Sequence, residues 1–347
     1  MRLSALIPLW LLIALSAPLA QAQDEYGRLD VGVVIFDVDA GADADAPGAY
    51  PRVRRVESVY LPVTLRQVLV DGGTWGVVRV VPQASALADL TIETRLVAST
   101  GLRLQLRVFA SDATGAVWLD QAYAMESSEG SYPVADGDDP FLTLYRRIAA
   151  DLQAFRAALS DAQLRDIRRV AFLRYAATLS PDAFAGYLEQ REGRYGVQRL
   201  PAQDDDMVAR VERIRNQEYL FIDTVDEQYT DLQRDMAPAY NLWRQYDREQ
   251  IVHRAEYEER VAGRGRSGKR GSFSAMQQVF NQYKVAKIQE QDVRELARGF
   301  DNETAPTVLE ADGRIFSLTG TLDSRYREWQ EILRQIFALE TGLPPGS

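Results

Sequence analysis

The chain has 347 residues, a mass of 39.0 kDa and a formal net charge of -10. This length predicts two or three domains, and 46% apolar residues are enough to bury real cores. The excess of 50 acidic over 40 basic side chains argues against nucleic-acid binding, which needs a basic face. No cysteine is present, which excludes thiol catalysis, disulfides and thiolate metal ligands, and a single histidine excludes a multi-histidine metal site within one chain.

Residues 1–22 have the pattern of a secretory signal peptide. A short basic start precedes the almost wholly apolar run from Leu3 to Ala20, and small residues stand at the two positions that signal peptidase reads. We expect cleavage after Ala22 and a periplasmic protein, at most peripheral to the outer membrane. The alternative is an uncleaved membrane anchor, although Pro8 and Pro18 interrupt the apolar run.

Residues 23–158 predict an α/β domain built on a mixed sheet. The continuous apolar run from Val31 to Phe36 is typical of a central strand. Helical spacing of apolar residues from Val56 to Val70 predicts a helix that ends at a glycine pair, and Trp75 to Val81 predicts a second strand. A first strand, a covering helix and a second strand therefore begin the domain.

The rest of this half predicts antiparallel strands and one more helix. Leu90 to Val97 and Leu102 to Val108 alternate in polarity around a short turn, which predicts a hairpin, and the segment that begins at Val117 predicts a third strand. A cap followed by Pro140 predicts a helix that runs to about Ala158.

Residues 159–347 predict a mainly helical domain. The pattern Ser160 to Gln163 is a capping box, and apolar residues from Met207 to Met236 predict a long amphipathic helix that stops near Pro238. Further helices are expected over 240–261, 276–300 and 322–337. One β-hairpin is expected near 307–318, where an Asp-Gly pair stands between two short apolar strands. The sequence therefore predicts an α+β fold.

The first half resembles the small α/β domain of the TolB amino-terminal type, which also occurs in CsgG-like and ABC-transport auxiliary envelope proteins. The likeness is carried by four segments: Val33 to Asp37, Leu61 to Gly73, Ala88 to Leu90, and Asp112 to Trp118. It covers about 130 residues and includes no catalytic motif. The resemblance implies envelope assembly or partner binding, by analogy of fold.

The whole chain is also similar to an uncharacterised family of exported proteobacterial envelope proteins. The segment Arg213 to Thr224 carries this likeness, together with Leu318 to Thr321, Tyr326 and Trp329. The resemblance implies no known reaction and no cofactor.

An acidic loop after the first strand is a candidate metal site. Asp37, Asp39, Asp43 and Asp45 alternate with small residues, and hard cations such as Ca²⁺ bind several oxygens within one short turn. The loop lacks the glycine and glutamate positions of a calcium-binding loop, so a solvated acidic loop is the simpler interpretation.

The basic cluster between residues 260 and 270 is the best candidate binding site. Five cations lie there without an intervening acid, among four glycines: Arg260, Arg264, Arg266, Lys269 and Arg270. Such a cluster can contact anionic lipid or cell-wall polymer, with about 1 kcal/mol per charge near an anionic surface. The alternative is a solvated loop between helices.

We therefore predict a non-catalytic envelope protein that binds a protein partner, an anionic lipid or cell-wall surface, or both. One alternative is an enzyme that acts on an envelope polymer through the carboxylates of Asp223 and Glu227, which share a helix face. Another is an accessory protein of an oligomeric export pore, although no strand is long enough to span a bilayer.

Overall fold

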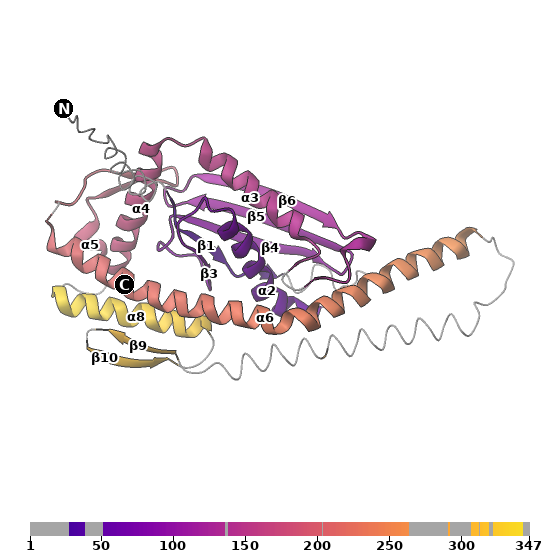
Figure 1. Ribbon diagram of the computed structural model, residues 1–347. Coiled ribbons are helices and arrows are strands. Elements are labelled where there is room, and N and C mark those ends of the chain that lie inside the picture. The colour runs from indigo at the N-terminus through magenta and orange to yellow at the C-terminus, as the bar shows by residue number, and fades with distance from the viewer. Residues whose placement is uncertain are drawn as a thin grey trace, which may run out of the picture.

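The computed structural model describes residues 28–38, 51–135, 138–202, 204–263, 291, 307–311, 313–318 and 322–342. A mixed sheet with its covering helices forms the first half, and the second half is mainly helical (Figure 1). The predicted α+β class is confirmed.

The sheet is parallel at one end and antiparallel at the other. Its strands run in the order β3-β1-β4-β5-β6, and the short β2 pairs with β4. β1 is parallel to β3 and β4, whereas β4, β5 and β6 form an antiparallel meander. The strands are β1 (Val31–Val34), β2 (Asp37–Val38), β3 (Val78–Val81), β4 (Leu90–Ser99), β5 (Arg103–Asp112) and β6 (Val117–Glu126).

Helices cover one face of this sheet and extend beyond one of its edges. The helices are α2 (Pro51–Asp71), α3 (Leu142–Ala157), α4 (Asp161–Leu179), α5 (Pro181–Phe184), α6 (Asp206–Gly263) and α8 (Leu322–Thr341), with a 3₁₀ turn η1 (Glu129–Ser131). Alternation in β5 buries Leu104, Leu106 and Val108 against α2 and α3, while Arg103 and Arg107 stay exposed on the open face. The sheet therefore packs on one side, as antiparallel sheets commonly do.

Several local predictions are confirmed. β4 and β5 form the expected hairpin, and β6 is the expected third antiparallel strand. Ser160 and Gln163 form the expected capping box at the start of α4. The late hairpin is present as β9 (Thr307–Ala311) and β10 (Arg314–Leu318), and the last apolar stripe is buried on α8. The helix expected over 276–300 lies outside the described residues, apart from Gln291.

The second half also holds a hairpin that we did not predict, formed by β7 (Leu188–Arg191) and β8 (Arg194–Val197). Its strands are short and polar, so the sequence shows no alternating apolar signal. Glu192 and Gly193 at its turn both have positive φ, 50° and 78°, which is typical of a type I′ turn.

Two hydrophobic cores share α4 and α6. The first lies between the sheet, α2 and α3, and the second lies among α4, α6, α8 and the late hairpin. On α6, Phe221 and Tyr229 belong to the second core, whereas Met236, Tyr240 and Trp243 belong to the first. Helices after residue 158 therefore complete the core of the first half.

The predicted stop at Pro238 is wrong. α6 is one helix of 58 residues with Pro238 inside it, and the helix expected from residue 240 is its continuation. A proline inside a helix removes one backbone hydrogen bond and costs about 3 kcal/mol. Met236 and Tyr240, which flank the proline, are fully buried against the first core. Their packing offsets the local cost and keeps the helix continuous.

Candidate functional site

α6 covers the edge of the sheet formed by β3. The backbone N–H of Val80 donates a hydrogen bond of 2.7 Å to Asp226, whose carboxylate also pairs with Arg66 at 2.8 Å. Arg79 of the same strand pairs with Asp223 at 2.5 Å. Burial raises the pKa of Asp226, and its cationic neighbours and the Val80 N–H oppose this effect. The helix thus occupies an edge that would otherwise be open to another strand.

α6 then reaches the turn between β4 and β5. The N–H of Gly101 donates a hydrogen bond of 2.7 Å to the buried carboxylate of Asp247. The buried Arg244 pairs with Asp139 at 2.8 Å, and its guanidinium lies 4.2 Å from the ring centroid of Tyr240. Two buried charges of α6 therefore have partners in the first half of the chain.

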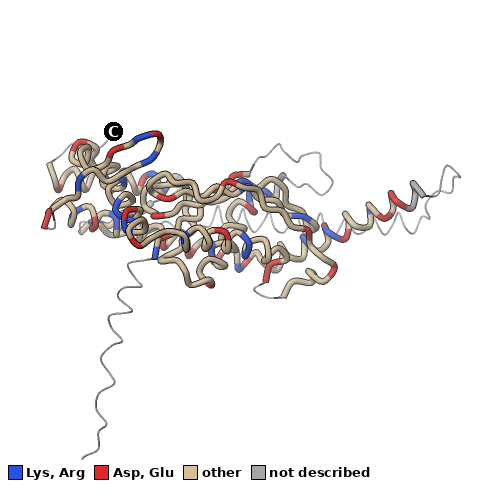
Figure 2. The backbone as a smooth tube through the Cα atoms, turned by 90° about the horizontal axis from the view of Figure 1, so that it is seen from above, with Lys and Arg blue, Asp and Glu red and all other residues tan. Residues whose placement is uncertain are grey.

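Past Asp247 the helix leaves the body gradually, and residues 248–252 are still half-buried. We call the 16 residues from Arg248 to Gly263 the α6 arm. At 1.5 Å per residue the arm is about 24 Å long. The side chains from His253 to Glu259 are exposed, and the helix projects beyond the sheet in both views (Figures 1 and 2). Figure 2 shows both acidic and basic residues along it.

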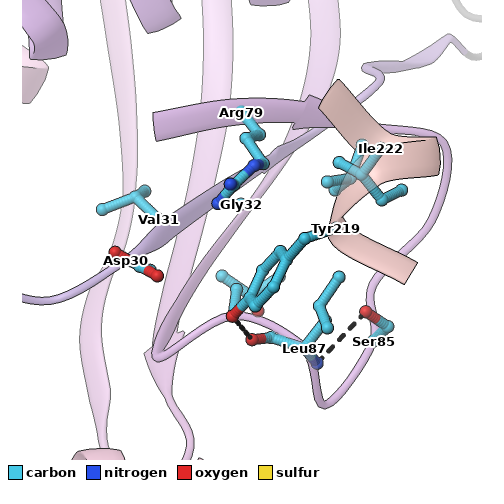
Figure 3. A pocket seen from close by; sticks show the side chains of 11 residues that line it. Asp30, Val31, Gly32, Arg79, Ser85, Leu87, Tyr219 and Ile222 are labelled. Carbon is cyan, nitrogen blue, oxygen red and sulfur yellow. Dashed lines mark hydrogen bonds between the residues drawn. The ribbon is translucent and has the colours of Figure 1, made fainter. Parts of the chain in front are cut away.

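A narrow crevice lies between the start of β1, β3 and the first third of α6 (Figure 3). Tyr219 enters it from α6, and its hydroxyl donates a hydrogen bond of 2.9 Å to the carbonyl of Leu87. Arg79 lies 4.4 Å from the centroid of the Tyr219 ring. The cavity measures about 20 Å³, which is room for about one water molecule. A metabolite or polymer unit does not fit there.

Beside this crevice, Asp89 is a buried carboxylate with a perturbed pKa. Burial raises its pKa from 3.8 to about 6. A hydrogen bond of 2.9 Å from the backbone N–H of Asp30 opposes the shift, as do the cationic side chains of Arg215 and Arg168. The Asp89 side chain is therefore partly held in place by the backbone that precedes β1.

Two further carboxylates are buried where helices meet. Glu57 of α2 accepts hydrogen bonds from Arg54 at 2.7 Å, Ser99 at 2.6 Å and Tyr240 at 2.6 Å. The group thus joins α2, the end of β4 and α6. Sequence reasoning missed it because its partners lie up to 183 residues away.

Glu218 of α6 has the equivalent role in the second core. Its carboxylate accepts hydrogen bonds from Tyr175 at 2.8 Å, Tyr326 at 2.7 Å and Gln330 at 3.0 Å. Burial and the adjacent carboxylate raise the pKa of the Tyr175 hydroxyl well above its usual value. This group joins α4, α6 and α8. The sequence offered one signal, an acidic residue inside an apolar helical stripe.

Each of the two predicted sites has one residue within the described part of the chain. Asp37 lies on β2, and its exposed carboxylate accepts a hydrogen bond of 2.9 Å from Arg95. Asp39, Asp43 and Asp45 lie outside the described residues. No group of three metal-ligating side chains occurs in the part of the chain that the structure describes. The calcium alternative therefore stays a prediction.

The basic cluster begins on the α6 arm. Arg260 belongs to the last turn of the arm, three residues before its end at Gly263. The other four cations of the cluster, Arg264, Arg266, Lys269 and Arg270, lie outside the described residues. The arm therefore carries the start of the cluster away from the body.

The carboxylates of the enzyme alternative are not paired with each other. Asp223 is bound by Arg79 at the β3 edge, and Glu227 lies exposed one turn later. His253 lies on the arm, 3.8 Å from Glu256. This arrangement does not favour acid–base catalysis at these positions, and the alternative stays a prediction.

No protein-family model and no curated protein matches this sequence. Among solved structures, a dodecamer of a PelC variant from Paraburkholderia phytofirmans is similar at 14% identity, over 38% of this chain and 89% of that one. Its TM-score is 0.23, which is too low to support a shared fold or function. Within the described ranges, no helix is both long and apolar enough to cross a bilayer.

Proposed function

We propose that this chain is a non-catalytic docking protein of the cell envelope and that the α6 arm is its contact element. The observation that carries the proposal is the continuation of α6 for about 24 Å past Asp247. Among the described residues, no side chain from His253 to Glu259 belongs to either core. Binding outside the chain gives the arm a role.

The position of the arm in the sequence supports an anionic target. Arg260 lies near the end of the arm, and the other four cations follow within seven residues of Gly263. Each cation near an anionic surface contributes about 1 kcal/mol to the free energy of binding, so the five together favour binding to such a surface. The pattern of a signal peptide in residues 1–22 supports the envelope as the compartment.

The rigid base of the arm supports a docking role as well. Arg244 and Asp247, at its base, are buried and bound to groups of the first half. A fixed base presents the tip at a defined distance and direction from the sheet. The resemblance of the first half to TolB-type envelope domains agrees with this proposal.

The proposal is tested by crosslinking in living cells. A photo-reactive residue replaces the exposed Glu258 of the arm, and in a control it replaces the exposed Glu328 on α8. Envelope fractions are separated, and crosslinked products are identified by mass spectrometry. A defined envelope protein, lipid or cell-wall fragment joined to position 258 and not to position 328 is the expected result.

A charge variant tests the basic cluster. Arg260, Arg264, Arg266, Lys269 and Arg270 are all changed to glutamine. The matched control changes five exposed arginines of the body: Arg146, Arg165, Arg169, Arg191 and Arg194. We expect the cluster variant to lose the crosslink at position 258 and the control to keep it. Equal fractionation of all three proteins, without crosslinks at position 258, would overturn the proposal.

A further inference from the structure

The two edges of the sheet are treated differently. α6 covers β3, whereas β6 lies at the opposite edge and pairs on one side only, with β5 (Figure 1). No strand among the described residues pairs with the outer side of β6. The strand has ten residues, six of them exposed, and contains neither lysine nor proline. Those two residues are common protection against strand pairing at an open edge.

The regular part of β6 begins at Leu119. A register shift opposite Ala110 and Ser111 leaves Trp118 as an extra residue, so Val117 and Leu119 pair with consecutive residues of β5. From Leu119 to Glu126 the strand alternates without interruption. Asp120 and Glu126 are the only charges in this stretch, and both lie on the open face of the sheet.

This charge pattern suits pairing with a second copy of the same strand. An antiparallel pair related by a twofold axis at Ala122 places Ala122 opposite itself, Asp120 opposite Ala124, and Leu119 opposite Met125. Seven regular residues, 119–125, then pair and no like charges oppose each other. Alanine on the axis keeps the crossing free of steric conflict.

Neighbouring registers are less favourable. An axis at Tyr123 places Asp120 opposite Glu126, and an axis at Asp120 places that carboxylate opposite its own copy. Like charges that directly oppose each other destabilise a strand pair. Axes at Gln121 and Ala124 each pair only five regular residues, 119–123 and 122–126. The pattern therefore selects one register.

We propose that two copies of this chain dimerise by antiparallel pairing of β6 about a twofold axis at Ala122, which joins their sheets into one. The inference rests on the sheet edge alone and is independent of the α6 arm.

Cysteine crosslinking tests the register, because the chain has no cysteine of its own. The protein is purified after export from cells that express the full-length sequence. Opposed residues of an antiparallel pair have Cα atoms about 4.5–5.5 Å apart, within the range for a disulfide. Ala122→Cys is expected to form a disulfide dimer under mild oxidation. Ala124→Cys, equally exposed, is the control, because four residues separate it from its copy, about 14 Å along the strand.

Charge variants test the dimer itself by light scattering. Ala122→Lys and Ala122→Glu each place like charges on the axis, and each is expected to be monomeric with an unchanged circular dichroism spectrum. An equal mixture of the two is expected to recover the dimer mass, which a misfolded variant could not do. A monomeric wild-type protein at tens of micromolar, a crosslink at 124 in place of 122, or dimers that persist in both charge variants would each overturn the proposal.

Discussion

Replacing Gly101 by alanine tests the contact between the β4–β5 turn and α6. A Cβ atom at this position would lie 1.9 Å from the carbonyl oxygen of Arg244 and 2.6 Å from the amide nitrogen of Arg248. Both are backbone atoms of a continuous helix, so they cannot move aside as a flexible side chain would. The turn and the helix must separate to accommodate one methyl group.

The expected cost follows from two effects. Overpacking a well-packed contact costs about 1–3 kcal/mol, and the 1.9 Å approach belongs at the upper end. Separation also breaks the buried hydrogen bond from Gly101 to the carboxylate of Asp247, which is worth about 1.5–3 kcal/mol. We expect Gly101→Ala to lower the free energy of unfolding by about 3–5 kcal/mol. A domain with about 5–15 kcal/mol of stability is strongly affected by such a loss.

Urea denaturation of wild type and variant measures this difference, with limited proteolysis to detect release of the second half of α6. Gly130→Ala is the matched control, because its added Cβ would meet nothing closer than 4.0 Å and the position is exposed. We expect the control to stay within about 0.5 kcal/mol of wild type. If Gly101→Ala also stayed within that margin, the close approach of turn and helix would not exist in solution, and the fixed base of the α6 arm would be refuted.

Three further predictions follow from buried groups. Burial raises the pKa of Asp89 to about 6, so its ionisation destabilises the fold increasingly as pH rises from about 4 to 6. Between denaturation at pH 4 and at pH 7, Asp89→Asn should therefore gain stability relative to wild type by on the order of 3 kcal/mol. The same difference between variant and wild type at both pH values would contradict this. Glu218→Gln puts an amide donor opposite a tyrosine hydroxyl in the second core and should cost about 1–3 kcal/mol in the same assay, whereas a neutral result would place the side chain in water. Pro238→Ala restores a helical hydrogen bond and should raise the urea midpoint by an amount equivalent to about 1 kcal/mol or more, unless α6 is broken at that residue.

The sequence predicted those elements whose cause is local. The hairpin around Gly101 follows from alternation over two strands, and the start of α4 follows from the side chains of Ser160 and Gln163. The late hairpin follows from the Asp-Gly pair before Arg314. Each of these signals lies within a few residues, so no knowledge of tertiary contacts is needed.

The errors arose where distant residues decide. Pro238 ends a helix in isolation, but burial of Met236 and Tyr240 against the first core keeps α6 intact. The buried charges of Arg244 and Asp247 were not singled out in the sequence, because their partners are 105 and 146 residues away. Such long-range pairing is invisible to patterns of spacing.

The candidate site shows the same division. The basic cluster that includes Arg260 was recognisable from the sequence alone, because its positive charge does not depend on the fold. That α6 carries Arg260 away from the body depends on where the helix passes the β4–β5 turn, at Asp247 and Arg248. The open edge at β6 could not be predicted either, because strand order in a sheet is not encoded in any single strand.

The continuity of α6 links these features. One helix closes the β3 edge through Asp226, completes both cores, and then leaves the body as the arm. A break at Pro238 would have divided those roles between two helices and left the direction of the arm to a hinge. Because the helix is continuous and Asp247 holds it to the β4–β5 turn, the direction of the arm is fixed relative to the sheet. If the arm binds as proposed, loss of that hydrogen bond should disturb its binding even though Asp247 is buried in the body.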